Sequence, residues 1–189
     1  MPGEWRRRSQ AARGPALLEG TLALVGALIL VGTSCSSDRE ASRWMLQVDT
    51  LRSDVDGSVR LATTLELPGK GGFAGQPRDE EVRLRFECRW GTGAFAAILT
   101  TRSLPSGTAA LRIRIDSLRP YPAAAATGRF GEWGMVYISE WSALLDSLRG
   151  HRSMLVEYSA GRTPATVAEF PVAGIDSLRP HFLAACAKR

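Results

Sequence analysis

Residues 81–90, EVRLRFECRW, decide how this chain folds. Apolar side chains occupy every second position, at Val82, Leu84, Phe86, Cys88 and Trp90, and charged side chains lie between them. A period of two places alternate residues on opposite faces of a pleated strand. The stretch therefore predicts a half-buried β-strand, with an apolar face turned to the core and a charged face turned to solvent.

The chain after residue 43 shows further strand patterns, together with loop and helix patterns. Residues 68–77 are rich in glycine and predict a mobile hairpin loop, and residues 121–128 are interpreted as a second loop. Helical spacing predicts one helix capped by Ser139 and a second helix over residues 175–187. Strand patterns are also present at residues 44–52, 58–67, 94–104, 111–116, 129–138, 154–158 and 166–172. The predicted fold class is β-rich α+β, an antiparallel sheet or sandwich of about eight strands with two helices.

The N-terminus has the pattern of an export signal. Residues 1–20 carry four arginines, residues 21–31 are an apolar run, and small residues then lead to Cys35. The run is too short to span a membrane, and its flanks predict a signal peptide over residues 1–34. Cys35 resembles the lipid-modified cysteine of a bacterial lipobox. We therefore expect a lipid anchor at Cys35, a polar tether over residues 35–43 and a single domain over residues 44–189, on the periplasmic side of a bacterial membrane. The alternative is a secreted periplasmic protein in which Cys35 is not lipidated.

Two further cysteines lie in the predicted domain. Cys88 is on the inward face of its strand, and Cys186 shares one helical face with Leu178 and Phe182. An even pair in an exported chain predicts a disulfide, which would tie the C-terminal helix to the sheet. The alternative is two buried thiols. No spacing of cysteine and histidine indicates a metal site.

Charge and motifs argue against several functions. The net charge is +5, but residues 1–34 hold four arginines and two glutamates, so the rest of the chain has 20 basic and 17 acidic groups. This mild excess does not favour nucleic acid as a partner. The histidines, His151 and His181, accompany no catalytic motif, so we expect no enzyme, no cofactor and no metal.

Outward-facing arginines form the candidate binding site. They are Arg83, Arg85 and Arg89 on one strand and Arg112 and Arg114 on another, with Asp116 beside Arg114. If those strands were neighbours, the arginines would form a basic face suited to anionic partners. The alternative is a solvated sheet face in which Glu87 and Asp116 balance the charge. Three copies of Asp-Ser-Leu-Arg also occur, at residues 116–119, 146–149 and 176–179, without a repeat architecture.

The order of several features resembles the type VI secretion-associated VasI/TagO family of envelope proteins. They are an early Trp44 before an acidic turn, a strand that ends at Cys88, the Arg114-Ile115-Asp116 strand followed by Trp133, and residues 168–174 leading to a helix with Cys186. The resemblance implies an exported accessory protein rather than an enzyme. It also makes Arg114 and Asp116 the first choice for a structural or binding role.

The expected function is therefore a non-enzymatic envelope lipoprotein that binds or supports a protein assembly, and the resemblance makes type VI secretion the candidate for that assembly. One alternative is a module that binds an anionic envelope polymer or lipid through the arginine face. A second alternative is a hydrolase whose site is not recognisable in the sequence.

Overall fold

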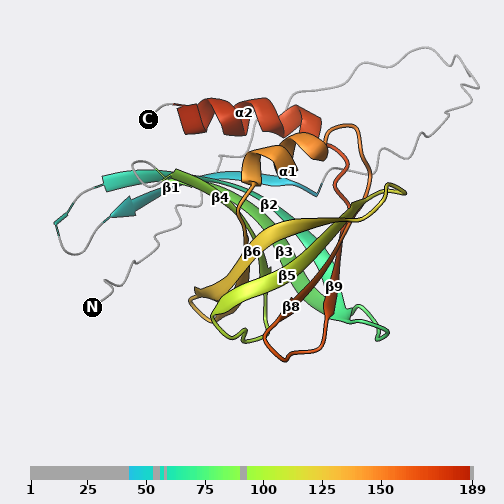
Figure 1. Cartoon of the computed structure of the whole chain (residues 1–189). Coiled ribbons are helices and arrows are strands. Elements are labelled where there is room, and N and C mark those ends of the chain that lie inside the picture. Colours follow the sequence, from blue (N-terminus) through green and yellow to red (C-terminus); the bar gives the residue numbers. More distant parts are fainter. Residues whose placement is uncertain (1–42, 53–55, 58, 90–92, 188–189) are drawn as a thin grey trace, which may run out of the picture.

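The computed structural model describes residues 43–187, except residues 53–55, 58 and 90–92. The predicted signal peptide, Cys35 and most of the tether lie outside these residues, as does Trp90. Nine strands and two helices occur in the described part of the chain (Figure 1). They are β1 (Met45–Arg52), β2 (Val59–Phe73), β3 (Glu80–Arg89), β4 (Gly93–Thr100), β5 (Gly107–Ile115), β6 (Tyr121–Phe130), β7 (Trp133–Ile138), α1 (Trp141–Ser147), β8 (Met154–Ala160), β9 (Thr166–Phe170) and α2 (Ile175–Ala187).

Eight of the strands close into an antiparallel barrel, and β1 lies outside it. The order around the barrel is β2, β3, β4, β7, β6, β5, β8 and β9, and β9 pairs back with β2. The predicted open sheet or sandwich is therefore wrong. The number of strands was close to correct, but period-two alternation cannot distinguish two packed sheets from one sheet that closes on itself.

The length of β2 closes the barrel. Its first half pairs with β1, and its last residues, Lys70 to Phe73, pair with β9 on the same edge. A Cβ atom at Gly69 would lie 2.5 Å from the carbonyl oxygen of Glu169, and one at Gly71 would lie 2.7 Å from Val82 Cγ1. Only glycine allows this close approach. Residues 68–73 of the glycine-rich stretch that predicted a mobile loop thus belong to β2 and form its seam with β9, and the residues that follow make the turn to β3.

Two further predictions about strands were wrong. Residues 121–128, interpreted as a loop, belong to β6, which is held between β5 and β7. Residues 129–138, interpreted as one strand, are divided by a turn in which Gly131 has a φ of 60°. Alanine and proline have low β-propensity, so β6 owes its conformation to its two neighbours rather than to its own composition.

The core fills the barrel and continues under the helices. On β3, Val82, Leu84 and Phe86 are completely buried, as the alternation predicted. The helices α1 and α2 lie together over one end of the barrel (Figure 1). There the Phe182 ring packs edge-on against Phe86 and Trp141, with centroids 6.5 and 6.4 Å apart.

Two of the Asp-Ser-Leu-Arg copies hold the helices together. Asp146, near the end of α1, forms an ion pair with Arg179 of α2. In return, Arg149 Nε lies 3.6 Å from Asp176 Oδ1 at the start of α2, and Asp176 Oδ2 accepts a hydrogen bond of 3.0 Å from the Gly150 amide. The repeated sequence therefore forms a reciprocal contact between neighbouring helices.

The predicted disulfide between Cys88 and Cys186 is not clearly formed. Cys88 and Cys186 are both buried and lie beside each other, as the shared inward faces required. They approach to 2.6 Å, which is longer than the bond of about 2.05 Å in a disulfide, so the pair is not a clear disulfide. Packing of α2 on the sheet, through residues such as Ile175 and Phe182, accounts for its position.

Candidate functional site

The edge of β1 is the most distinctive surface of the described residues. β1 pairs with β2 along one edge, from Met45 to Arg52, and no strand in the described part of the chain pairs with its other edge. Each of the eight barrel strands has a neighbour on both sides. A strand edge presents a row of backbone N–H and C=O groups that can pair with another strand.

One face of this hairpin carries exposed aliphatic side chains. Val48 and Val59 are each 61% exposed, and Leu61 is 44% exposed. On β2, the residues of this face change from fully buried Leu65 to exposed Val59 because the cover given by α2 ends. We call Val48, Val59 and Leu61 the hairpin strip. Exposed apolar residues that gather next to an open edge are typical of interaction surfaces.

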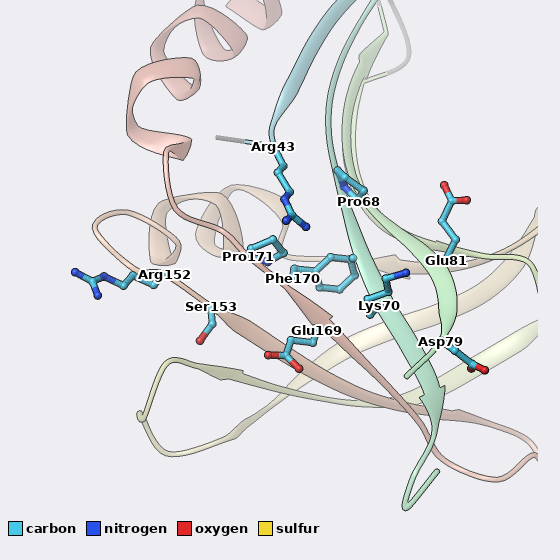
Figure 2. Close-up of a pocket in the computed structure, with 11 residues that line it drawn as sticks. Arg43, Pro68, Lys70, Asp79, Glu81, Arg152, Ser153, Glu169, Phe170 and Pro171 are labelled. Carbon is cyan, nitrogen blue, oxygen red and sulfur yellow. The ribbon is translucent and has the colours of Figure 1, made fainter. Parts of the chain in front are cut away.

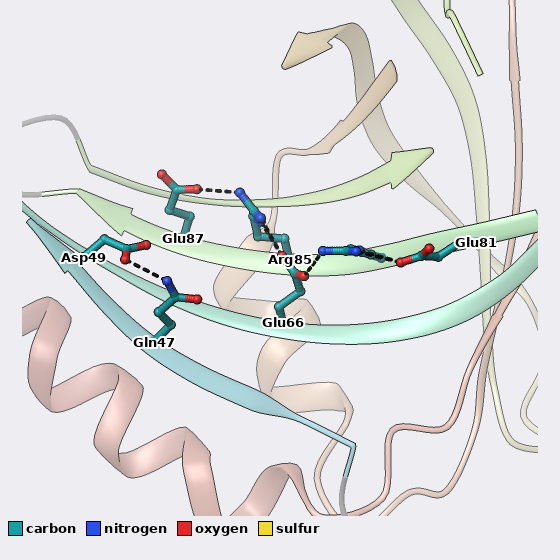
Figure 3. Close-up of polar contacts among 7 residues, drawn as sticks. Gln47, Asp49, Glu66, Glu81, Arg85 and Glu87 are labelled. Atoms are coloured by element: carbon teal, nitrogen blue, oxygen red, sulfur yellow. Dashed lines mark hydrogen bonds and ion pairs between the residues drawn. The ribbon is translucent and has the colours of Figure 1, made fainter. Parts of the chain in front are cut away.

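The opposite face of β1 carries Gln47 and Asp49 beside Met45, which is 51% exposed. Gln47 Nε2 donates a hydrogen bond of 2.7 Å to Asp49 Oδ1 (Figure 3). Because successive residues alternate between faces, Val48 lies on one side of the edge of β1 and the Gln47–Asp49 pair lies on the other. A strand added there would therefore meet different chemistry on its two faces.

The three arginines of β3 do not form a free basic face. Arg85 donates to Glu66 Oε2 through Nε at 2.8 Å and through Nη2 at 2.5 Å, and it also lies 3.5 Å from Glu87 (Figure 3). The side chains of Arg85 and Glu66 are each 9% exposed, and that of Glu87 is 4% exposed. Buried charges of both signs are therefore paired within the protein.

The flanking arginines are held in the same way. Arg83 binds Glu81 and Glu66, and the hydrogen bond to Glu81 raises the pKa of Arg83. Arg89 forms an ion pair with Glu87. Each β3 guanidinium also lies over an aromatic ring, at 5.1 to 5.7 Å from the ring centroid; the rings belong to Trp133, Phe130 and Phe95. Glu66, directly opposite Arg85 across the β2–β3 pair, completes the cluster, and its alternating position in residues 58–67 was the signal that sequence reasoning missed.

The structure does not bring Arg112 and Arg114 to this cluster. They are exposed on β5, and three strands separate β5 from β3 in either direction around the barrel. Arg112 lies opposite Glu157 of β8. The arrangement that would have made one basic face from both strands is absent from the described residues.

Asp116 has a structural position at the end of β5. Its Oδ1 accepts hydrogen bonds from the Ser153 amide at 2.7 Å, the Arg152 amide at 3.1 Å and the Ser153 hydroxyl at 3.1 Å. Its Oδ2 lies 2.9 Å from His151 Nδ1. The hydrogen bond from His151 and then those from residues 152 and 153 lower the pKa of Asp116 to about 2. Asp116 also has a φ of 47°, so it forms the turn that it stabilises.

These three residue types do not form a catalytic triad. In a triad the serine hydroxyl is bonded to the imidazole, which takes its proton. Here Ser153 Oγ and His151 Nδ1 both bind the carboxylate of Asp116. The imidazole is therefore not placed to activate the hydroxyl in this arrangement.

An open cleft of about 750 Å³ lies beside the seam between β2 and β9 (Figure 2). Pro68, Gly69, Phe170 and Pro171 give it apolar walls, and charged side chains of both signs surround them. Glu169 is paired with Arg78, Glu81 is paired with Arg83, and Lys70 lies opposite both glutamates in the strand register. This neutralised lining offers no convergent set of groups for catalysis.

The described residues contain no group of three or more cysteine, histidine, aspartate or glutamate side chains that could hold a metal ion. Neither α1 nor α2 has the length and apolar composition that a helix needs to cross a membrane. Comparisons of the chain with protein-family models, with curated proteins and with solved structures found no match.

Proposed function

We propose that the protein is a non-enzymatic lipoprotein of the bacterial cell envelope, and that it binds a protein assembly through the edge of β1. The proposed anchor is the lipid-modified Cys35 and the proposed location is the periplasmic side of a membrane. Both follow from the signal-like residues 1–34. The resemblance to the VasI/TagO family makes an assembly associated with type VI secretion the first to test.

The observation that carries this proposal is the edge of β1 beside the hairpin strip, which pairs with no strand in the part of the chain that the structure describes. Addition of a strand to an open edge gives affinity through backbone hydrogen bonds and specificity through alternate side chains. Val48 is exposed next to this edge and would contact an apolar side chain of the added strand. The β3 arginines support a polymer-binding function less well, because glutamates already neutralise them.

The test is an in-cell crosslink and pull-down of the tagged full chain, with the recovered proteins identified by mass spectrometry. Wild type is compared with Val48→Lys and with the control Leu118→Lys. Leu118 is 54% exposed and lies in the turn after β5, away from β1. The reference is a lipoprotein that has only the signal segment of this chain. Relative to it, we expect wild type and Leu118→Lys to enrich the same envelope proteins, and Val48→Lys to lose them. Equal recovery with Val48→Lys would contradict docking at β1.

The anchor requires a separate measurement. Intact-mass analysis of the protein extracted from membranes is expected to show cleavage before Cys35 and the added mass of a diacylglyceryl group. Cys35→Ser should move the protein to the soluble fraction. An unmodified N-terminus at another position would contradict the lipoprotein assignment.

A further inference from the structure

We propose that the edge of β1 is occupied by β1 of a second copy of this chain, in an antiparallel register centred on Val48. This inference rests on the proposed function, because it makes a second copy the member of the assembly that pairs with this edge, and the other envelope proteins would bind the resulting dimer. The dimer would have a two-fold axis through the centre of β1. Seven residues of each strand would then be paired, with about six to eight backbone hydrogen bonds between the copies.

The register follows from the residues on β1. In an antiparallel pair centred on Val48, Val48 faces Val48 of the second copy, and Gln47 faces Asp49. A shift by one residue would place Val48 opposite Asp49. The positions of Val48 and Asp49 therefore favour a register that is centred on Val48 and complementary to itself.

Charge favours the same pairing. Asp49 would face the uncharged Gln47 of the other copy, and Arg52 lies outside the seven paired residues, so no two like charges are directly opposed. The Gln47 amide group has two N–H donors and uses one on its own Asp49. Its second donor is available for Asp49 of the second copy. The two Gln47–Asp49 pairs can thus form one continuous hydrogen-bonded set across the axis.

The apolar face is complementary as well. The hairpin strips of the two copies would meet at Val48, which is 61% exposed in the single chain. Pairing would join them into one apolar surface that crosses the axis. A C2 interface of this kind needs only one patch that matches itself. An unrelated extended segment could supply the backbone hydrogen bonds, but nothing requires its side chains to match Val48, Gln47 and Asp49 as those of a second copy do.

The first test uses cysteine crosslinking of the full chain in membranes. Val48→Cys is expected to give a disulfide-linked dimer under mild oxidation, at several times the yield of the control Leu118→Cys and of wild type. The register is tested with Gln47→Cys and Asp49→Cys together, which should crosslink more efficiently than Gln47→Cys alone. No excess of dimer with Val48→Cys, or equal yields from the single and double variants, would overturn this arrangement.

The second test measures mass by light scattering on the full chain extracted in a mild detergent. Wild type is expected at twice the monomer mass, and Val48→Lys at the monomer mass because two lysines would face each other. The exposed position of Val48 keeps this variant folded, which circular dichroism checks. A folded wild-type monomer would overturn the inference.

The two proposals fail separately. If wild type is monomeric but still recovers envelope proteins that Val48→Lys loses, the edge serves a different partner and the second-copy inference is wrong. If wild type is dimeric and Val48→Cys crosslinks, but no other envelope protein is recovered, the inference holds and the proposed function is wrong.

Discussion

The carboxylate of Asp116 offers the most direct test of the structure. It joins the end of β5 to the start of β8 through hydrogen bonds from the backbone of residues 152 and 153 and from His151. The change to make is Asp116→Asn. Asparagine tolerates the left-handed conformation of Asp116, whose φ is 47°, so the variant removes the negative charge without adding backbone strain.

The magnitude follows from the pKa of Asp116. A decrease in the pKa of Asp116 from the ordinary value of 3.8 to about 2 corresponds to about 2.4 kcal/mol of stabilisation, before solvent screening is taken into account. The side chain is 32% exposed, so solvent screening reduces the contribution to about 1–2 kcal/mol. The folded state binds the proton less tightly than the unfolded state. The stabilisation is therefore complete above pH 3.8 and is lost as the pH falls toward 2.

The assay is urea unfolding of wild type and Asp116→Asn at several values between pH 6 and pH 2. We expect wild type to be more stable by about 1–2 kcal/mol at pH 6 and the difference to decrease below pH 4. The comparison of two proteins at each pH removes the effect of other carboxylates. A difference that stays constant over this range would refute the lowered pKa, and no difference at pH 6 would refute the structural role.

Three further predictions concern the barrel. Gly69→Ala should lower the free energy of unfolding by about 2–3 kcal/mol, because its Cβ would overlap the backbone of β9. The control Lys70→Ala should change it by less than about 0.5 kcal/mol. Equal effects in denaturant unfolding would contradict the close contact of β2 with β9. Arg85→Leu should destabilise by about 3 kcal/mol because it leaves Glu66 buried without its main partner, and Glu66→Leu added to it should restore most of the loss. Tyr158→Phe should change stability by less than about 1 kcal/mol at neutral pH, because it removes only the hydroxyl and keeps the buried ring in the core. Burial raises the pKa of Tyr158, so wild type should lose stability above pH 10 while Tyr158→Phe loses less, and identical alkaline profiles would contradict this.

The alternation of residues in β3 was sufficient to predict its inward face. Val82, Leu84 and Phe86 are fully buried because period-two spacing depends only on local backbone geometry. The same local information could not show that the other face is covered too. Arg85 and Glu87 are buried because Glu66 and aromatic rings from β6 and β7 pack on that face.

The candidate site could be predicted only in part. Sequence reasoning selected Arg83 to Arg89 as outward-facing and named Glu87 as a balancing charge, but it did not identify Glu66 and Glu81, which also neutralise them. It described residues 44–52 as a strand but gave no sign that this strand has a free edge. Whether an edge is free depends on which strands are neighbours, and strands distant in sequence make that choice.

By itself, the sequence determined most of the strands, the two helices and the inward side of strands such as β3 and β5. These features follow from spacing along a short piece of backbone. The tertiary structure alone decided that β2 pairs with both β1 and β9, and so that eight strands close into a barrel while β1 stays outside. The reason is physical: closure brings the backbone of β9 close to Gly69, where a Cβ atom would not fit, and a glycine-rich segment has the same composition in a loop as in a crowded seam.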